Sequence, residues 1–176
     1  MRWLFAVGLG GCANVLGLSS IEPPPECPLT YQTIEGGGPV SSYRYFQRAV
    51  TWAEAEADCE NDAPGDTHLV VFDSTDELVA VRQLVTDVTS YNLFVGYARN
   101  FGDDPFVFYA VTGETVESGT PEWYLWQAGE PNNFNGIETI TFIESVATMR
   151  DGEPTRTERY ICECDGRPVT RTFQLQ

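Results

Sequence analysis

The chain has 176 residues, of which 42% are hydrophobic and 20% are charged, and its formal net charge is −16 at pH 7. This length suits one domain with short extensions, and the apolar content excludes a wholly disordered chain. So acidic a surface repels phosphate backbones, which argues against nucleic acid as a partner. Excess carboxylate suits the binding of Ca2+, which takes oxygen ligands, although solubility alone also explains the charge.

The first eleven residues have the features of an export signal. Arg2 is followed by an apolar run over residues 3–9, which is too short to span a bilayer, and then by small residues. The sequence LGGC at residues 9–12 resembles the lipobox of bacterial lipoproteins, which implies cleavage before Cys12 and a lipid on its thiol. The alternative is an ordinary secretion signal in which Cys12 has no role. Either way, the sequence predicts a protein outside the cytoplasm, secreted or lipid-anchored at the outer cell surface.

A proline-rich segment separates the signal (1–11) from the rest of the chain. Residues 12–26 include three consecutive prolines, which are typical of a stiff, extended tether. We expect the folded domain over residues 27–165 and a C-terminal tail over 166–176. No CxxC pair occurs and His68 is the only histidine, so the sequence argues against a Cys/His zinc site and a histidine-based catalytic triad.

The first predicted elements are a strand and a helix. Aromatic residues alternate over 42–47, which predicts a strand. Thr51 followed by Glu54 has the pattern of a capping box and predicts the start of a helix. The helical spacing of Trp52, Ala55 and Cys59 places these three residues on one buried face.

The remaining elements are a second helix, several strands and a long loop. An apolar strand at 69–72 precedes a helix that is capped at 74–77, and 93–97 is a buried strand. Residues 100–129 have few regular signals, and a loop of that length is usually functional. Two further strands are predicted, at 137–143 and 159–164. The apolar stripe of the second helix consists of Leu78, Val81, Leu84 and Val85. This order predicts an α+β domain with two helices and a mainly antiparallel sheet.

Four stretches, taken in order, resemble the C-type lectin-like domain. They are the helix over 52–59 with the following LVVF and Glu77, the core strand Phe94-Val95-Gly96, the WxxGEPN-like stretch at 126–132, and the closing strand at 160–163. The resemblance covers residues 27–165. It implies the C-type lectin-like fold, with two helices, small antiparallel sheets and a long irregular ligand-binding loop.

The resemblance also implies how the cysteines pair. Cys59 is expected to bond to Cys162, and Cys27 to Cys164, outside the cytoplasm where disulfides persist. The family's disulfide across the ligand loop has no cysteines here, and Ile140 stands where one would fall. Cys12 is then the one cysteine left over.

The resemblance implies a calcium and sugar site in the loop. Glu130-Pro131-Asn132 resembles the family's EPN motif, in which the bond before proline is cis. Glu138 lies eight residues after Glu130, and Asp151 lies thirteen after Glu138, as in the family. The implied ligands of Ca2+ are Glu130, Asn132, Glu138 and Asp151, and the same residues would bind vicinal hydroxyls of mannose-, glucose- or fucose-type glycans.

Other residues of the loop have weaker predicted roles. An aromatic ring is expected to stack on the apolar face of the sugar, and the candidates are Trp123, Tyr124 and Phe134. An accessory calcium site at Asp103 or Asp104 is less favoured than simple solvation of these carboxylates. Paired carboxylates also occur in glycosidases, but no nucleophile and base support that reading, so we expect a binding protein and no enzyme.

One residue departs from the family pattern at the expected metal position. Met149-Arg150-Asp151 stands where the family has Trp-Asn-Asp. Arginine has no oxygen lone pair and adds positive charge beside a cation site. Either Arg150 turns to solvent and leaves a weaker calcium site, or it pairs with Glu138 or Asp151 and replaces the metal. The sequence favours the first outcome, an extracellular calcium-dependent carbohydrate-binding lectin domain. The second outcome, kept as the alternative, predicts a calcium-independent, protein-binding domain.

Overall fold

The computed structural model describes residues 26–85, 91–117, 120–144 and 148–176. The predicted signal, Cys12 and nearly all of the predicted tether therefore lie outside the described residues. Among the described residues, no helix is long and apolar enough to cross a membrane. The elements, in chain order, are β1 (Ser42–Val50), α1 (Trp52–Asp62), β2 (Thr67–Leu69), α2 (Thr75–Val81), η1 (Arg82–Leu84), β3 (Asn92–Ala98), β4 (Phe108–Ala110), β5 (Thr115–Val116), η2 (Pro121–Leu125), η3 (Phe134–Gly136), β6 (Ile140–Glu144), β7 (Met149–Gly152) and β8 (Glu158–Cys164).

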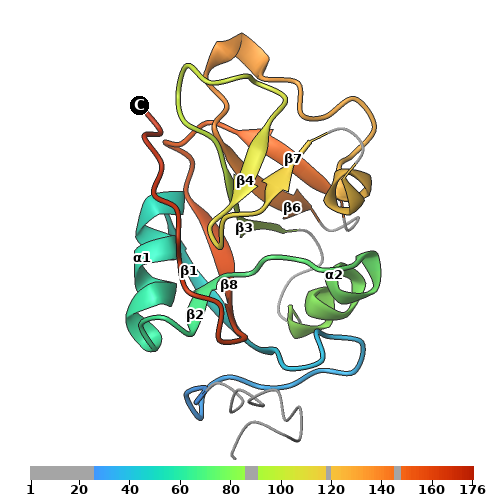
Figure 1. The fold of residues 1–176 in the computed structure, drawn as a ribbon, viewed down its shortest axis with the longest axis vertical. Coiled ribbons are helices and arrows are strands. Elements are labelled where there is room, and N and C mark those ends of the chain that lie inside the picture. The colour runs from blue at the N-terminus through green and yellow to red at the C-terminus, as the bar shows by residue number, and fades with distance from the viewer. Residues whose placement is uncertain (1–25, 86–90, 118–119, 145–147) are drawn as a thin grey trace, which may run out of the picture.

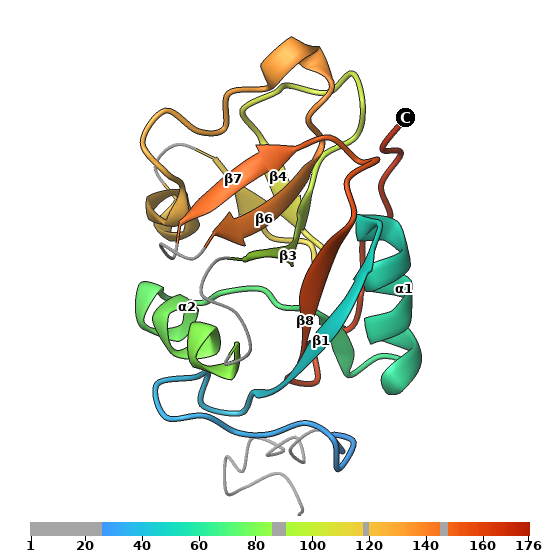
Figure 2. The ribbon, with the colours of Figure 1, turned by 180° about the vertical axis from the view of Figure 1, so that it is seen from behind.

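Strand β8 lies at the centre of the sheet. It pairs antiparallel with β1 and β2 and parallel with β3. Strand β3 pairs antiparallel with β4 and β6, and β6 pairs with β7. Helices α1 and α2 lie on opposite sides of the β1–β8 ribbon, while β3, β4, β6 and β7 form the other half of the domain with the long loops (Figures 1 and 2). The α+β fold predicted from the sequence is confirmed.

Helix α1 begins as the sequence predicts. The Thr51 hydroxyl accepts the Glu54 N–H, and the Glu54 carboxylate accepts the Thr51 N–H at 2.9 Å, which completes a capping box. Trp52, Ala55 and Cys59 are buried on the inner face. The indole of Trp52 also donates to the carbonyl of Val95 at 2.8 Å, which ties the helix to β3.

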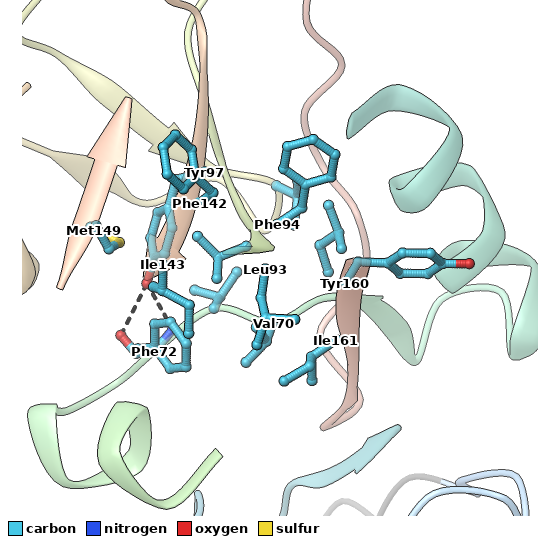
Figure 3. Packing of buried hydrophobic residues seen from close by; sticks show 14 of the residues in the cluster. Val70, Phe72, Leu93, Phe94, Tyr97, Phe142, Ile143, Met149, Tyr160 and Ile161 are labelled. Carbon is cyan, nitrogen blue, oxygen red and sulfur yellow. Dashed lines mark hydrogen bonds between the residues drawn. The ribbon is translucent and has the colours of Figure 1, made fainter. Parts of the chain in front are cut away.

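The strand predicted at 69–72 is shifted toward the N-terminus, since β2 ends at Leu69. Beyond that residue, the backbone N–H groups of Val71 and Phe72 bond to side chains. Val71 N–H donates to Glu163 at 3.0 Å, and Phe72 N–H donates to the Tyr97 hydroxyl at 2.7 Å. Figure 3 shows the Tyr97 hydroxyl reaching both backbone groups of Phe72 inside the apolar core.

The stretch predicted as a long loop contains short elements. Strands β4 and β5 and the 3-10 helix η2 lie within residues 100–129, and Phe108, Ala110 and Val116 are buried there. The strand predicted at 137–143 begins only at Ile140, and β7 was not predicted. Strands β4, β5 and β7 have two to four residues, which are too few to show a reliable period, so the sequence does not reveal them.

Two disulfides close the fold at its central strand. Cys27 bonds to Cys164 with 5.7 Å between Cα atoms, and Cys59 bonds to Cys162 with 5.3 Å. These are the pairs implied by the resemblance. Ile140, which stands where a loop cysteine would fall, is fully buried, so packing takes the place of a cross-link there.

The segment after Asp165 packs against the domain and runs alongside α1 (Figures 1 and 2). The ring of Phe173 lies edge-on to Trp52, with 5.8 Å between centroids. The Phe101 N–H donates to the carbonyl of Gln174 at 2.7 Å. The residues predicted as a C-terminal tail are therefore held to the fold by backbone hydrogen bonds and by an aromatic contact.

Candidate functional site

We name the loop site the group formed by residues 127–138, residues 149–151 and Arg99. A backbone hydrogen bond from Gln127 N–H to the Met149 carbonyl, 3.0 Å long, joins its two segments. The Glu130-Pro131 bond is cis, as in the EPN motif that the sequence resembles. This pairing brings Glu130 beside the side chain that follows Met149, which is Arg150.

Arg150 forms two ion pairs, with partners that differ from those predicted. Its Nε donates to Glu130 Oε1 at 3.1 Å and its Nη1 donates to Glu144 Oε1 at 2.8 Å. The prediction of Glu138 or Asp151 as the partner was wrong. The β6–β7 register explains the choice, since Arg150 lies opposite Phe142 and so shares a sheet face with Glu144, while Asp151 points to the other face.

Both oxygens of the Asp151 carboxylate accept backbone N–H groups. Its Oδ1 accepts the Asn132 N–H at 3.0 Å and its Oδ2 accepts the Asn133 N–H at 2.8 Å. Asp151 is buried, and Asn133 has a positive φ of 48°, which asparagine tolerates better than most residues. Asp151 therefore fixes the course of the chain just after the EPN motif.

The other two carboxylates of the loop site hold excess negative charge. Burial, together with the charges of Asp151 and Glu130, raises the pKa of Glu138 to about 7, although the Phe134 N–H bond to this carboxylate opposes the shift. Burial, followed by Asp151, also raises the pKa of Glu130 against the opposing effect of Arg150. Glu130 Oε2 is buried and has no hydrogen-bond partner among the described residues.

Arg99 is a member of the loop site that the sequence did not suggest. It is almost fully buried, and its Nη2 donates to Asn133 Oδ1 at 2.8 Å. Its Nη1 donates to the carbonyls of Asn100 and Asp103, both at 3.3 Å. The available signal was an arginine two positions after the end of the buried strand predicted at 93–97. Glu144, the second partner of Arg150, was also missed.

The neighbouring acidic turn uses its carboxylates within the chain. Asp103 accepts the Asn100 side-chain N–H at 2.9 Å, and Asp104 accepts the Phe106 N–H at 2.9 Å. The positive charge of Arg99 faces both carboxylates, as well as Asp151. The accessory calcium site, already the less favoured reading of the sequence, thus gains no support from this geometry.

As folded, the loop site does not fit Ca2+. This ion takes six to eight oxygen ligands. Arg150 occupies one oxygen of Glu130, and both oxygens of Asp151 accept N–H groups. Among the described residues, the one set of three His, Cys, Asp or Glu side chains with ligand atoms within 4.8 Å of one another lies elsewhere, at His68, Glu163 and Asp165.

Two exposed aromatic rings are available for contact near the loop site. Trp123 packs against Trp126, with 6.3 Å between centroids, and is only partly exposed. Tyr124 and Phe134 are 79% and 64% exposed. Of the three rings proposed from the sequence, these two are therefore the better placed to meet a ligand.

The described residues have a C-type-lectin-like fold, the fold that the sequence resembles. Its defining features are two helices, a mixed sheet around β8 and two disulfides. No family model matches the chain. A C-type lectin of Thrasops jacksonii, a lectoxin, is similar to it, with 26% identity over 143 residues, which cover 78% of this chain and 83% of the lectoxin.

Solved structures show the same fold. The C-type lectin CEL-I from Cucumaria echinata has a TM-score of 0.63 and 20% identity, over 78% of this chain and 96% of CEL-I. A calcium-independent type II antifreeze protein has a TM-score of 0.60 and 18% identity, over 80% of this chain and 95% of that one. The fold is thus shared with at least one protein that does not need calcium.

Proposed function

We propose that this chain is an extracellular recognition domain that binds a protein ligand through the loop site without calcium. The observation that supports this most directly is the 3.1 Å ion pair between Arg150 Nε and Glu130 Oε1. It places a permanent cation on a carboxylate that a calcium ion would need. The similarity to a calcium-independent antifreeze protein agrees with this reading.

The side chains around the ion pair suit contact with a protein. Arg150 remains 36% exposed, and Tyr124 and Phe134 present their rings to solvent. Arginine and aromatic residues are the types most enriched at the centres of protein interfaces. Arg99 and Asp151 form hydrogen bonds with Asn132 and Asn133, so that these side chains are presented on a fixed backbone.

Calcium-dependent binding of glycans or glycoproteins is the second candidate. The observation that favours it is the unpartnered oxygen of Glu130, since Oε2 is buried with no hydrogen-bond partner among the described residues. Burial and Asp151 also raise the pKa of Glu130. The implied residues are Glu130, Asn132, Glu138 and Asp151, with mannose-, glucose- or fucose-type ligands. This function requires Arg150 to release Glu130. The similarity of the fold to that of the C-type lectin CEL-I also supports this candidate.

Isothermal titration of Ca2+ into the full chain separates the two. We expect no heat at millimolar Ca2+ for the unmodified chain, and calcium binding in Arg150→Asn, which removes the cation and adds an amide oxygen. Arg48→Asn is the matched control, because Arg48 lies on β1 with an exposed side chain and pairs with Asp58.

Calcium binding by the unmodified chain would overturn the first proposal, if it is lost in Glu130→Ala/Asn132→Ala and accompanied by mannose binding only with Ca2+. That result would establish the second function. Failure of Arg150→Asn to gain calcium would contradict the role given to Arg150.

The location of the chain is a proposal that rests on its first residues. We propose export, with a lipid on Cys12. Mass spectrometry of the purified protein should show a diacylated Cys12 at the new N-terminus, and Cys12→Ser should be released from the membrane fraction. An unmodified Cys12 would leave secretion without an anchor.

A further inference from the structure

A second group of titratable side chains lies between β2 and β8, away from the loop site. We name it the strand cluster, and it consists of His68, Glu163 and Asp165. His68 lies opposite Glu163 in the antiparallel register, and Asp165 directly follows β8. One ligand atom from each residue lies within 4.8 Å of the others. His68 and Glu163 are fully buried, and the Asp165 side chain is 4% exposed.

The orientation of His68 is fixed by a backbone group. Its Nδ1 lies 2.7 Å from the carbonyl of Leu69, and a carbonyl only accepts, so Nδ1 carries a proton. Nε2 then faces the carboxylates and lies 3.1 Å from Asp165 Oδ1. Metal-bound histidines usually donate their other ring N–H to a carbonyl or carboxylate in this way.

Glu163 supplies an independent observation. Its Oε2 accepts the Val71 N–H at 3.0 Å, but its Oε1 is buried with no hydrogen-bond partner among the described residues. A buried carboxylate oxygen without a partner is costly, so native structures seldom leave one unless an ion or water satisfies it. The unpartnered oxygen belongs to a completely buried side chain of the cluster.

We propose that His68, Glu163 and Asp165 bind a divalent transition-metal ion of the zinc class. Zinc binds imidazole nitrogen and carboxylate oxygen at about 2.0–2.2 Å. Two such ligands at a tetrahedral angle lie roughly 3.3–3.5 Å apart, which is close to the 3.1 Å between Nε2 and Oδ1. The sequence argued against zinc because it has one histidine and no CxxC pair, whereas here two carboxylates complete the donor set.

Arg167 covers the strand cluster on its solvent side. Its backbone N–H donates to Asp165 Oδ1 at 2.8 Å, and its Nε donates to the same carboxylate. Its Nη2 lies 3.9 Å from Glu163 Oε2 and its Nη1 lies 3.0 Å from Asp73 Oδ1, with 28% of the side chain exposed. Without metal, the Arg167 guanidinium and a proton on His68 Nε2 face the carboxyl groups of Asp165 and Glu163. Binding of the ion takes the place of that proton, which passes to the buffer, and Arg167 moves toward Asp73 and solvent.

The test uses the full chain carrying Cys12→Ser, so that no free thiol competes for metal. After treatment with a chelator, we expect calorimetry to give one Zn2+ per chain, and Co2+ to give the visible absorption of a tetrahedral complex. His68→Gln and Asp165→Asn should each lower the affinity at least about tenfold. Two controls should not, namely Glu60→Gln on the exposed face of α1 and Glu138→Gln in the loop site.

Near-ultraviolet circular dichroism before each titration shows whether a variant keeps the fold, and Asp165→Asn, which keeps the imidazole, is the milder change. Absence of zinc binding at millimolar concentration would overturn the proposal and leave the cluster as an ion pair only. Equal affinity in the folded His68→Gln and Asp165→Asn variants would do the same. A loss confined to Glu138→Gln would place the metal in the loop site, which also contradicts the proposal.

Discussion

The loop site and the strand cluster are two acidic groups in which an arginine pairs with a carboxylate, but their side chains are brought together in different ways. In the strand cluster, His68 and Glu163 come from paired strands, so the register fixes where their donor atoms meet. In the loop site, Asp151 uses both oxygens to accept the backbone N–H groups of Asn132 and Asn133. Matching a family's spacing along the chain therefore predicts which residues gather, but not which atoms remain free for a ligand.

The largest effect on stability should come from removing a disulfide of β8, the strand that carries Glu163 of the strand cluster. A Cys59→Ala/Cys162→Ala variant loses the disulfide between α1 and β8, and we expect its free energy of unfolding to fall by about 2–4 kcal/mol. Urea unfolding measures this change. Cys12→Ser is the control and should unfold at the same urea concentration as the unmodified chain. An unchanged midpoint in the double variant would contradict the stabilising role given to this cross-link.

The pH dependence of stability should come mainly from buried groups around the strand cluster. Burial lowers the pKa of His68, but the hydrogen bond to Asp165 and the charges of Glu163 and Asp165 outweigh it and raise the pKa to about 9. Burial raises the pKa of Glu163 to about 8 and that of Glu56, which faces His68 from α1, to about 7.

All three groups bind more protons in the folded than in the unfolded chain over this range. The stabilisation from His68 is complete below the ordinary histidine pKa of about 6.5 and is lost as the pH rises through 9. Raised carboxyl pKa values act in the same direction, so the free energy of unfolding should fall between about pH 5 and pH 9. Thermal melts of the chelator-treated chain should show this decline, and His68→Gln should make it shallower. A melting temperature that rises toward high pH would contradict the assignment.

A smaller effect is expected in the loop site. Asp151→Asn removes the charge that accepts two backbone N–H groups, and we expect a loss of about 1–2 kcal/mol. Hydrogen exchange should quicken at Asn132 and Asn133 while the strands stay protected. Asp104→Asn, in an exposed turn, is the matched control. Faster exchange throughout the sheet would mean that the two regions are not separate.

The smallest effect is expected at an exposed ring. Phe134→Ala should change the free energy of unfolding by no more than about 0.5 kcal/mol, because the ring is 64% exposed. Thermal melts check this. A larger loss would show that Phe134 supports the loop and does not serve as a contact surface.

Local patterns in the sequence were enough to predict much of the fold. The capping box at Thr51 and Glu54 depends on residues three apart, and the structure contains it. Strands β4 and β5 were missed because three and two residues are too few to show alternation. The resemblance supplied both disulfide pairs, which spacing alone leaves open.

Whether the contacts of a site residue could be predicted depends on how far along the chain its partners lie. Glu130 and Arg150 were both singled out, yet their pairing depends on the backbone bond between Gln127 and Met149, which no motif encodes. His68 was noted only as the single histidine, because Glu163 lies 95 residues further on (163 − 68) and meets it only through strand pairing. Contacts that depend on register became visible only in three dimensions.

The Cys27–Cys164 bond also determines how the domain would bear mechanical load. If a ligand held at Asp151 were pulled against the chain ahead of Cys27, the force would pass down β8 and cross to Cys27 through a covalent bond. Asp151 and Cys164 are only thirteen positions apart (164 − 151) along this path. The extended length of that segment is about 47 Å at most. Tension would therefore bypass most of the chain, and the domain would yield by a short, limited extension.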